Sequence, residues 1–548
     1  MNKLKHFLQT TVIIFLFLTG CSNQIKNSNT TTQNESIPVT DETSLLIASA
    51  DNFTLVCSKQ TLPDSFLYQL AANVAVSPCA ERSTDIQFEI SSAQPVSQWI
   101  YSLAAPFYTI DDDINFDLLK LAWQQGNQSG LMISHLMVDQ STYEVFTTLW
   151  GPAQNEFVLI RDYNDMKEII RDDVTNWAII PFEQIEPVWK IITVDGQSPI
   201  RKDFDLQVYP LQAPISILIS SADQLETVNS LKTSLSIPPT NRDAYKLSTV
   251  LLTGVTALVR ATANTMERRG MTYPADDIRM WFLDADIVHI SNEIPFAENC
   301  PQPFPRPDEL VFCSQTEYIE LLESIDTDVV ELSGDHFQDW GAEATLYTIE
   351  LYKERGWQYY GGGVNLQDGL KPIRLETNGN KIAFIGCNAK GGAYAGATET
   401  NPGAAECDFD YMTEQIRLLR EDGYLPIVTF QHLEYYTYKA HPILQEDFHQ
   451  VADAGAVIVS GSQAHQPHAI ELYNGAFLHY GLGNLFFDQL FESPETGQAF
   501  IDRHVFYDGK YLGTELLTIQ FIDLAQSRPM TIEERQILLF NVFNANQH

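Results

Sequence analysis

Residues 287–293 read Ile-Val-His-Ile-Ser-Asn-Glu, and this stretch shows the pattern that decides the fold of the C-terminal half. A short, mostly apolar run rich in β-branched residues ends in an amide and a carboxylate. Short runs of this kind, bounded by polar residues, predict buried strands. In α/β sheets, sites form outside the carboxyl ends of the strands. The stretch therefore predicts a buried strand with Asn292 and Glu293 at its functional end.

The same pattern recurs at three later apolar runs, each of which is followed by polar side chains. These side chains are Asp335 and His336, then His432, and finally Gln463 and His465. Because the carboxyl ends of parallel strands meet at one edge of a sheet, we expect these residues to lie close together. Mixed imidazole and carboxylate ligands suit Zn, Mn or Fe. The sequence therefore predicts a shared polar site that is able to hold a divalent metal.

Strand-like and helix-like runs alternate from about residue 246 onward. The predicted strands are 248–253, 287–291, 329–332, 381–385, 425–430, 456–460 and 477–480, and the predicted helices are 317–324, 344–356, 410–422 and 443–454. Alternation of this kind predicts an α/β domain in which helices cover a sheet.

A second, smaller α/β domain is expected over residues 44–240. Helix-like and strand-like stretches are mixed here, and Pro238-Pro239 marks the boundary with the next domain because it disfavours a continuing helix. The order of helix-like and strand-like stretches in this region is similar to that of a solute-binding-protein-like module. An α/β domain without a ligand fits the same pattern, and both interpretations stay open.

The N-terminus has the layout of a secretory signal. Lys3 and Lys5 precede an apolar run, which ends in Leu-Thr-Gly before Cys21. This resembles the lipobox of bacterial lipoproteins, in which the cysteine is acylated; an ordinary signal peptide is the alternative. We expect residues 1–21 to be the lipoprotein signal, with lipidation at Cys21. The polar residues 22–43 then form a flexible tether, and the protein is extracytoplasmic with the membrane as a partner.

Charge and cysteine content agree with export. A formal net charge of -38 argues against nucleic acid as a partner, because phosphate binding needs a basic surface. Six cysteines remain after Cys21, and an even number in an oxidising compartment suggests disulfides. They fall into sequence-local couples, although fifteen pairings are possible. The local couples are Cys57 with Cys79, Cys300 with Cys313, and Cys387 with Cys407.

Several motifs of the C-terminal half carry a family resemblance. Asn292-Glu293, Gly334-Asp335-His336, the glycine turn 361–363, His432, the segment 461–465 and Tyr-Gly-Leu-Gly-Asn-Leu-Phe-Phe-Asp at 480–488 follow one another in order. Together they resemble the CapA domain of bacterial capsule and poly-γ-glutamate synthesis proteins, which is similar to the calcineurin-like metallophosphoesterases. The resemblance implies a metallophosphoesterase-type β-sandwich flanked by helices over residues 246–490, completed by residues 491–548.

The resemblance also implies roles for the site residues. The implied metal ligands are Glu293, Asp335, His432 and His465, the implied catalytic residues are His336 and Asp335, and the implied substrate-binding or supporting residues are Asn292, Gln463, Asn484 and Arg260. His336 is expected to act beside the metal as a general acid or a transition-state donor.

The sequence departs from the family pattern at several positions, among them Leu433-Glu434 in place of the Trp-Gly that follows His432. Val255 stands where the family has a metal-binding aspartate, Gln463 replaces a second imidazole, and Asp335 replaces an asparagine. Three hypotheses remain. The first is a one-metal hydrolase or transferase acting on a phosphoester or polymer bond, and the second is a non-catalytic protein that binds an extracellular polymer or its synthesis machinery. The third is a surface receptor whose N-terminal region binds a small solute and whose second domain acts on, or signals from, that solute. Arg260, Arg268 and Arg269 are candidates for a local basic patch, or for a solvated helix face.

Overall fold

This computed structural model describes residues 56–70, 76–79, 86–219, 224–305, 311–391, 395–489 and 493–545. The signal, Cys21 and the tether predicted for residues 1–43 lie outside the described residues, so they stay predictions. Among the described helices, none has the length and apolar character that crossing a bilayer requires.

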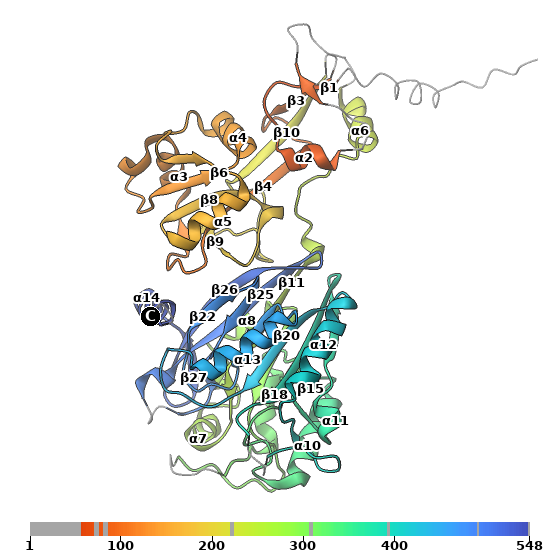
Figure 1. Cartoon of the computed structure of the whole chain (residues 1–548), viewed down its shortest axis with the longest axis vertical. Helices are drawn as coiled ribbons and strands as arrows, with labels where there is room; N and C mark the ends of the chain where they lie inside the picture. The colour runs from red at the N-terminus through yellow and green to blue at the C-terminus, as the bar shows by residue number, and fades with distance from the viewer. Residues whose placement is uncertain are drawn as a thin grey trace, which may run out of the picture. The chain divides into compact units, whose positions relative to one another are not determined.

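The first C-terminal sheet runs in the order β15-β14-β13-β11-β25-β26-β27, with β12 and β24 attached beside β13. Figure 1 labels its strands β11, β15, β25, β26 and β27. Its strands are β11 (Leu247–Thr253), β12 (Val255–Thr256), β13 (Ile287–Asn292), β14 (Val329–Glu331), β15 (Gln358–Tyr360), β24 (Asn484–Phe486), β25 (Gln498–Tyr507), β26 (Lys510–Ile522) and β27 (Gln526–Pro529). Strands β11, β13, β14 and β15 are parallel neighbours, whereas β25 to β27 are antiparallel. The segment after residue 490 therefore supplies strands to this sheet.

The second C-terminal sheet runs in the order β17-β18-β20-β21-β23-β22. Its strands are β17 (Ile373–Thr377), β18 (Asn380–Asn388), β20 (Leu425–Gln431), β21 (Ile458–Ser460), β22 (Ile470–Tyr473) and β23 (Ala476–His479). The central strands β18, β20, β21 and β23 are parallel. Every residue of β20 is buried, which explains why its sequence is a continuous apolar run and not an alternating one.

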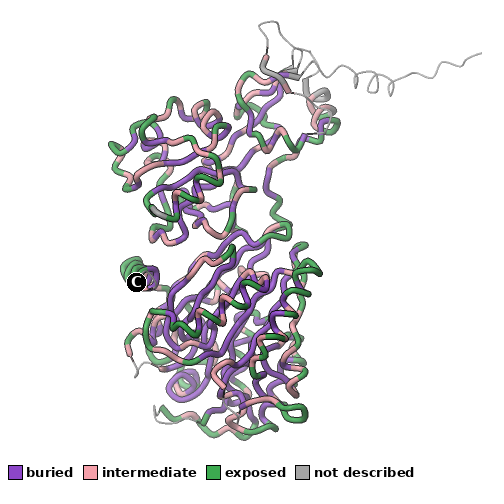
Figure 2. The backbone as a smooth tube through the Cα atoms, viewed as in Figure 1, coloured by how far each residue is buried: buried purple, intermediate pink, exposed green. Residues whose placement is uncertain are grey.

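The two sheets pack face to face and helices cover their outer faces. The core between the sheets joins Val250 and Leu252 of β11 to Phe384 of β18 and Ile427 of β20. The covering helices are α7 (Arg260–Arg269), α8 (Arg279–Leu283), α9 (Ile319–Glu323) and α10 (Gly341–Glu354) on the first sheet, and α12 (Phe409–Glu421) and α13 (Pro442–Asp453) on the second. The buried strands form the interior of this part (Figure 2). The predicted β-sandwich flanked by helices is confirmed, and the predicted strands and helices occur with shifts of a few residues at their ends.

The N-terminal region carries a separate sheet of ten strands in the order β2-β1-β3-β10-β4-β8-β6-β7, with β9 and β5 branching from β4. Its strands are β1 (Val56–Ser58), β2 (Ser77–Pro78), β3 (Ile86–Ile90), β4 (Ser97–Pro106), β5 (Asp113–Ile114), β6 (His135–Val138), β7 (Val158–Ile160), β8 (Asn176–Pro181), β9 (Trp189–Val194) and β10 (Gln212–Ile219). The helices here are α2 (Asp64–Gln69), α3 (Phe116–Gln125), α4 (Gln140–Trp150), α5 (Tyr163–Asp172) and α6 (Gln224–Ser234). The region is α/β as expected, and its solute-binding character stays a prediction.

The remaining short elements of the C-terminal half are β16 (Gly362–Gly363), β19 (Gly403–Ala404), α11 (Leu366–Gly369) and the last helix α14 (Ile532–Asn544). Helix α14 begins with a capping box, in which Thr531 and Glu534 satisfy each other's backbone amides.

All three sequence-local disulfides are present. Their Cα–Cα distances are 4.9 Å for Cys57–Cys79, 5.8 Å for Cys300–Cys313 and 5.0 Å for Cys387–Cys407. These distances lie within the range that a disulfide spans without backbone strain. The predicted local pairing is confirmed, and it agrees with an oxidising, extracytoplasmic compartment.

We expect peptide mapping of the unreduced protein by mass spectrometry to recover these three linkages, because each pair is already within bonding distance in the fold. A reduced and alkylated sample is the control and should yield six separate cysteine peptides. Recovery of a linkage between Cys300 and Cys387, or any other crossed pair, would contradict the fold at that position.

Candidate functional site

Two parallel neighbouring strands bring three predicted site residues together. Glu293 follows β13, Asp335 and His336 follow β14, and one ligand atom of each lies within 4.8 Å of the others. Gly334 makes this approach possible: a Cβ atom there would lie 2.8 Å from both the Cα and the carbonyl oxygen of Glu293. The prediction that polar strand ends converge holds for these three residues.

The carboxylates of this cluster are buried and incompletely paired. Glu293 is 1% exposed, and neither of its carboxylate oxygens has a hydrogen-bond partner among the described residues. The Oδ1 atom of Asp335 also has no hydrogen-bond partner among the described residues. Burial raises the pKa of Glu293, against the lowering effect of the imidazoles of His465 and His336. Because an uncompensated buried charge is costly, three such oxygens at one place suit a bound cation.

Lys390 is the cationic side chain that reaches this cluster. Its Nζ lies 2.6 Å from the Oδ2 of Asp335 and also pairs with the carboxylate of Glu434. Burial works to lower the pKa of Lys390, but the carboxylates of Glu434 and Asp335 outweigh it and raise the pKa. The ammonium therefore stays charged and neutralises part of the acidic cluster.

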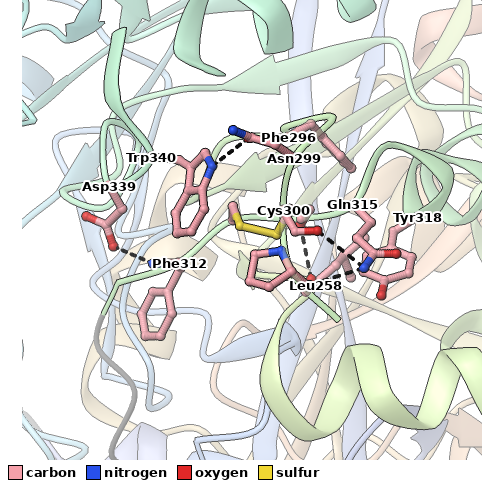
Figure 3. Close-up of a disulfide and its surroundings, with 12 residues drawn as sticks. Leu258, Phe296, Asn299, Cys300, Phe312, Gln315, Tyr318, Asp339 and Trp340 are labelled. Carbon is pink, nitrogen blue, oxygen red and sulfur yellow. Dashed lines mark hydrogen bonds between the residues drawn. A yellow bond between two sulfur atoms is a disulfide. The ribbon is translucent and has the colours of Figure 1, made fainter. Parts of the chain in front are cut away.

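His336 is held by a second carboxylate. Its Nδ1 lies 2.7 Å from the Oδ2 of Asp339, which also accepts a 2.9 Å hydrogen bond from the Phe312 amide. Burial works to lower the pKa of His336, but the hydrogen bond to Asp339 and the charge of Glu293 raise it to about 9. Figure 3 shows the Asp339–Phe312 contact beside the disulfide formed by Cys300.

His465 stands at the edge of the cluster. Its Nε2 lies 3.9 Å from a carboxylate oxygen of Glu293 and 3.9 Å from one of Glu434. Its Nδ1 pairs with the Oδ1 of Asn484 at 2.9 Å, and the Asn484 amide donates in turn to the His465 and Thr496 carbonyls. Asn484 therefore orients the imidazole so that its free nitrogen faces the carboxylates.

His432 is not brought into this cluster. Its Nε2 lies 2.8 Å from the Oδ2 of Asp447, and its Nδ1 accepts from the Leu433 amide. Both ring nitrogens are engaged, so a rotation of the side chain would be needed before His432 could bind a metal.

The two amides expected to support the site are both buried. The Asn292 amide donates to the Ile294 carbonyl and the Tyr352 hydroxyl, and so fixes the turn that precedes the cluster. Gln463 is 1% exposed, and its amide nitrogen and oxygen have no partner among the described residues. Gln463 is therefore available to a ligand. Asn292 gives its amide nitrogen to the scaffold, and its buried Oδ1 has no partner among the described residues.

Arg260 lies behind the site and is inaccessible to a polymer. It is 2% exposed and pairs with Asp488, with Nε and Oδ1 3.2 Å apart. Its guanidinium stacks over the rings of Phe312 and Phe487, which contact the imidazoles of His336 and His465 on the site side. This geometry supports a structural role for Arg260: it holds the two phenylalanine rings that pack behind the imidazoles.

Val255 lies in an apolar cluster and offers no ligand. It packs with Ile294, Phe312 and Phe487 and is fully buried. The position that the family resemblance assigns to a metal-binding aspartate is therefore hydrophobic here, which is compatible with a site for one metal.

Two features of the site could not be assigned from the sequence. Lys390 follows β18, but the predicted strand ended at Ile385 and so its end was placed three residues too early. Glu331 is fully buried in β14 and accepts hydrogen bonds from the hydroxyls of Ser333 and Ser462. It thereby ties the loop that carries Asp335 to the loop that carries His465.

The layers and the acidic strand ends together define an α/β protein with a two-sheet sandwich flanked by helices. Residues 249–489 match the family model described as bacterial capsule synthesis protein PGA_cap. The match falls on the same part of the chain whose motifs carry the resemblance.

Two characterised relatives match over more than the domain itself. The chain is 24% identical over 330 residues to the capsule biosynthesis protein CapA of Bacillus anthracis, covering 59% of this chain and 77% of the relative. It is 23% identical over 278 residues to the PGA biosynthesis protein CapA of Bacillus subtilis, covering 50% and 71%. Among solved structures, a 5'-nucleotidase precursor from Thermus thermophilus is 13% identical, covers 54% of this chain and 58% of that one, and has a TM-score of 0.31. That similarity is too low to carry a functional argument.

We expect the His336 imidazole of the metal-free protein to titrate near pH 9, because Asp339, Glu293 and Asp335 favour its charged form. The stabilisation from this charge is fully present below the unfolded-state pKa and is lost as the pH rises through about 9. An NMR titration of the ring protons measures the midpoint, and Asp339→Asn should lower it by about one unit or more.

His289 provides an internal control for this titration. Its pKa is lowered to about 3 by burial, so its ring signals should not move across the neutral and alkaline range. A His336 midpoint near 6.5 that Asp339→Asn leaves unchanged would show that the Asp339 contact does not hold the proton.

Proposed function

We propose that this chain is an extracytoplasmic protein of capsular polymer synthesis, anchored through Cys21, whose acidic cluster holds one divalent cation and cleaves or transfers a bond of the polymer or of its precursor. The names of the two relatives support the pathway, and the three disulfides support the compartment. The Cys21 anchor rests on the sequence.

One observation carries the catalytic part of this proposal. Three carboxylate oxygens, two of Glu293 and one of Asp335, are buried without partners and converge beside His336. Such a donor set fits a hard or borderline divalent cation such as Mn, Zn or Fe. Glu293 and Asp335 would hold the ion, which would supply Lewis-acid polarisation of a phosphoryl or carbonyl oxygen.

The chain's own residues supply the remaining chemistry. His336 keeps its proton at neutral pH through Asp339, so it can donate to the oxygen on which negative charge develops. His465, oriented by Asn484, presents its Nε2 to the carboxylate of Glu293 as a second donor or acceptor. The buried amide of Gln463 can bind a polar group of the substrate.

A non-catalytic, polymer-positioning role is the second candidate, and one specific arrangement favours it. Lys390 already neutralises Asp335 and Glu434, while Val255 removes the ligand that a second metal would need. In this alternative the ammonium replaces a metal and the domain only binds polymer. Metal binding and hydrolysis assays separate the two candidates.

We expect the wild-type chain to bind Mn²⁺ with one-to-one stoichiometry in isothermal titration calorimetry. Glu293→Gln should weaken binding by about a hundredfold or more, because it removes a buried carboxylate whose two oxygens accept no hydrogen bond among the described residues. Glu298→Gln is the matched control: Glu298 is an exposed acid five residues away, and its loss should leave the affinity unchanged. Equal affinities for the Glu293 and Glu298 variants would place the metal elsewhere.

Lys390→Gln should have the opposite effect on the affinity for Mn²⁺. Removal of the ammonium frees the Oδ2 of Asp335 and takes away a repelling charge, so the affinity should rise by about tenfold. Lys390→Arg, which keeps the charge, is the control and should bind like the wild type. A weaker affinity in the Gln variant would mean that Lys390 supports the ion instead of competing with it. In that case the phosphodiesterase activity of the two variants would decide between a catalytic and a binding domain.

A further inference from the structure

Phe312 supports the site residue His336 in two ways. The ring centres of the two residues lie 4.7 Å apart. The backbone amide of Phe312 also donates a 2.9 Å hydrogen bond to the Oδ2 of Asp339, and the same oxygen lies 2.7 Å from the Nδ1 of His336. A shift of Phe312 would therefore disturb both the ring that packs against His336 and the carboxylate that holds it.

A disulfide is attached directly to this support. Phe312 is followed by Cys313, and Cys313 is bonded to Cys300 (Figure 3). Cys300 ends the short segment that leaves the site at Glu293. The bond therefore connects the chain that carries a proposed metal ligand to the chain that supports His336.

The disulfide also contacts the residue that follows Asp339. Trp340 packs in the same small cluster as both cysteines (Figure 3). The Nε1 of Trp340 donates a 2.8 Å hydrogen bond to the Oδ1 of Asn299, which directly precedes Cys300. The surroundings of Asp339 are thus tied to the disulfide from a second side, through an aromatic ring and a side-chain hydrogen bond.

The chain after Cys313 is held independently of the disulfide. Ser314 donates its amide to the Pro295 carbonyl and accepts a hydrogen bond from the Ala297 amide, both at 2.9 Å. These backbone contacts do not need the sulfur atoms, so we expect the sandwich to persist when the bond is opened. Phe312 lies on the other side of Cys313 from these contacts, so the effect of opening should be local to Phe312 and its neighbours.

We propose that the Cys300–Cys313 disulfide is a positioning element of the site, which holds Phe312 against His336 and Asp339, so that full activity requires the oxidised bond. The proposal rests on the proposed catalytic role and concerns the regulation of that same site. A disulfide restricts the conformations open to the segment it closes, and here the two cysteines have a sequence separation of 13. Because misplacing a reacting group by about 1 Å can cost about a hundredfold in rate, a local shift of Phe312 is enough to lower activity.

A dithiol can open this bond by thiol–disulfide exchange. One thiolate of the dithiol attacks a sulfur of the bridge and forms a mixed disulfide, which the second thiolate of the dithiol resolves. Two electrons and two protons pass to the cysteines, which leaves two protein thiols and an oxidised dithiol. In a reducing compartment the chain would therefore hold His336 less firmly, and oxidation after export would complete the site.

The test compares the wild-type full chain with the double variant Cys300→Ser, Cys313→Ser. Hydrolysis of bis(p-nitrophenyl) phosphate should fall about tenfold in kcat in the variant, because His336 is less well placed. The affinity for Mn²⁺, measured by isothermal titration calorimetry, should stay unchanged, because the pairing of β13 with β14 places Glu293 and Asp335 without the bond.

A second readout does not depend on activity. The ring current of Phe312 shifts the NMR signals of the His336 ring protons, and these signals are recorded at one pH on metal-free protein with labelled histidine. His336→Gln assigns them by their loss. In the Cys300→Ser, Cys313→Ser variant the signals should move toward the position of an unstructured histidine, and signals that stay in place would overturn the proposal.

The matched control removes a disulfide of the N-terminal region. Cys57→Ser with Cys79→Ser should keep the wild-type kcat and the wild-type His336 signals. Equal changes in the two double variants would show a general effect of losing a disulfide, and the proposal would be overturned. Thermal unfolding of each variant shows whether a lost signal is a lost fold.

Reduction of the folded wild type tests the same bond if the Cys300→Ser, Cys313→Ser variant does not fold. The protein is treated with dithiothreitol, which is removed before the assay, and mass spectrometry identifies the bridges that have opened. The kcat should fall in step with the opening of Cys300–Cys313 and should return on oxidation with oxidised glutathione. A kcat that follows the opening of another bridge instead would overturn the proposal.

The two readouts separate this proposal from the proposed function. If the wild type does not hydrolyse the phosphodiester, the catalytic proposal fails, and the His336 signals alone decide whether the disulfide positions the imidazole. If the wild type is active and the Cys300→Ser, Cys313→Ser variant keeps both its kcat and its His336 signals, the positioning role fails and the catalytic proposal stands. In an active protein, a change in one readout without the other would overturn the positioning role as well.

Discussion

The repulsion between two buried carboxylates, those of Glu293 and Asp335, is the constraint around which the site is built. Parallel pairing of β13 and β14 places their carboxyl ends side by side, and Gly334 lets the second loop press against the backbone of the first. Burying like charges this closely is unfavourable unless a cation compensates them. Lys390 pairs with only one oxygen of Asp335. The other oxygen of Asp335 and both oxygens of Glu293 have no hydrogen-bond partner among the described residues, so a further cation would stabilise the cluster.

The surrounding scaffold fixes this arrangement at the level of the loops. Glu331 ties the loop that carries Asp335 to the loop that carries His465 through two serine hydroxyls. Asp339 binds His336 and also accepts a hydrogen bond from the backbone amide of Phe312. The stacked guanidinium of Arg260 supports the aromatic wall from behind. Asp339 acts on its imidazole by direct contact, Arg260 acts through one aromatic ring, and Glu331 acts through the two serines. The sandwich therefore keeps Glu293, Asp335 and His336 together even though Val255 offers no ligand.

Periodicity in the sequence predicted an α/β domain, because buried parallel strands are continuous apolar runs whose ends meet at one edge. The sandwich itself was implied by the family resemblance of the motifs. The rule that strand ends meet placed Glu293, Asp335 and His336 together. It could not orient His432, since the direction of that ring depends on Asp447 of α13, fifteen residues later in the chain. It also could not separate buried from exposed arginines: the pattern around Arg260 is compatible with a solvated helix face, and only packing against Phe312 and Phe487 shows otherwise. Lys390 was missed because the end of a strand is the least certain part of a sequence prediction.

The most direct test of this account is a crystal structure of the Mn²⁺-soaked protein with anomalous diffraction data. The account predicts one anomalous peak, within coordinating distance of both Glu293 and Asp335, with Lys390 moved away from the Oδ2 of Asp335. Two peaks bridged by Asp335 would contradict the one-metal site. A cluster without a peak, in which Lys390 still neutralises Asp335, would contradict metal binding itself.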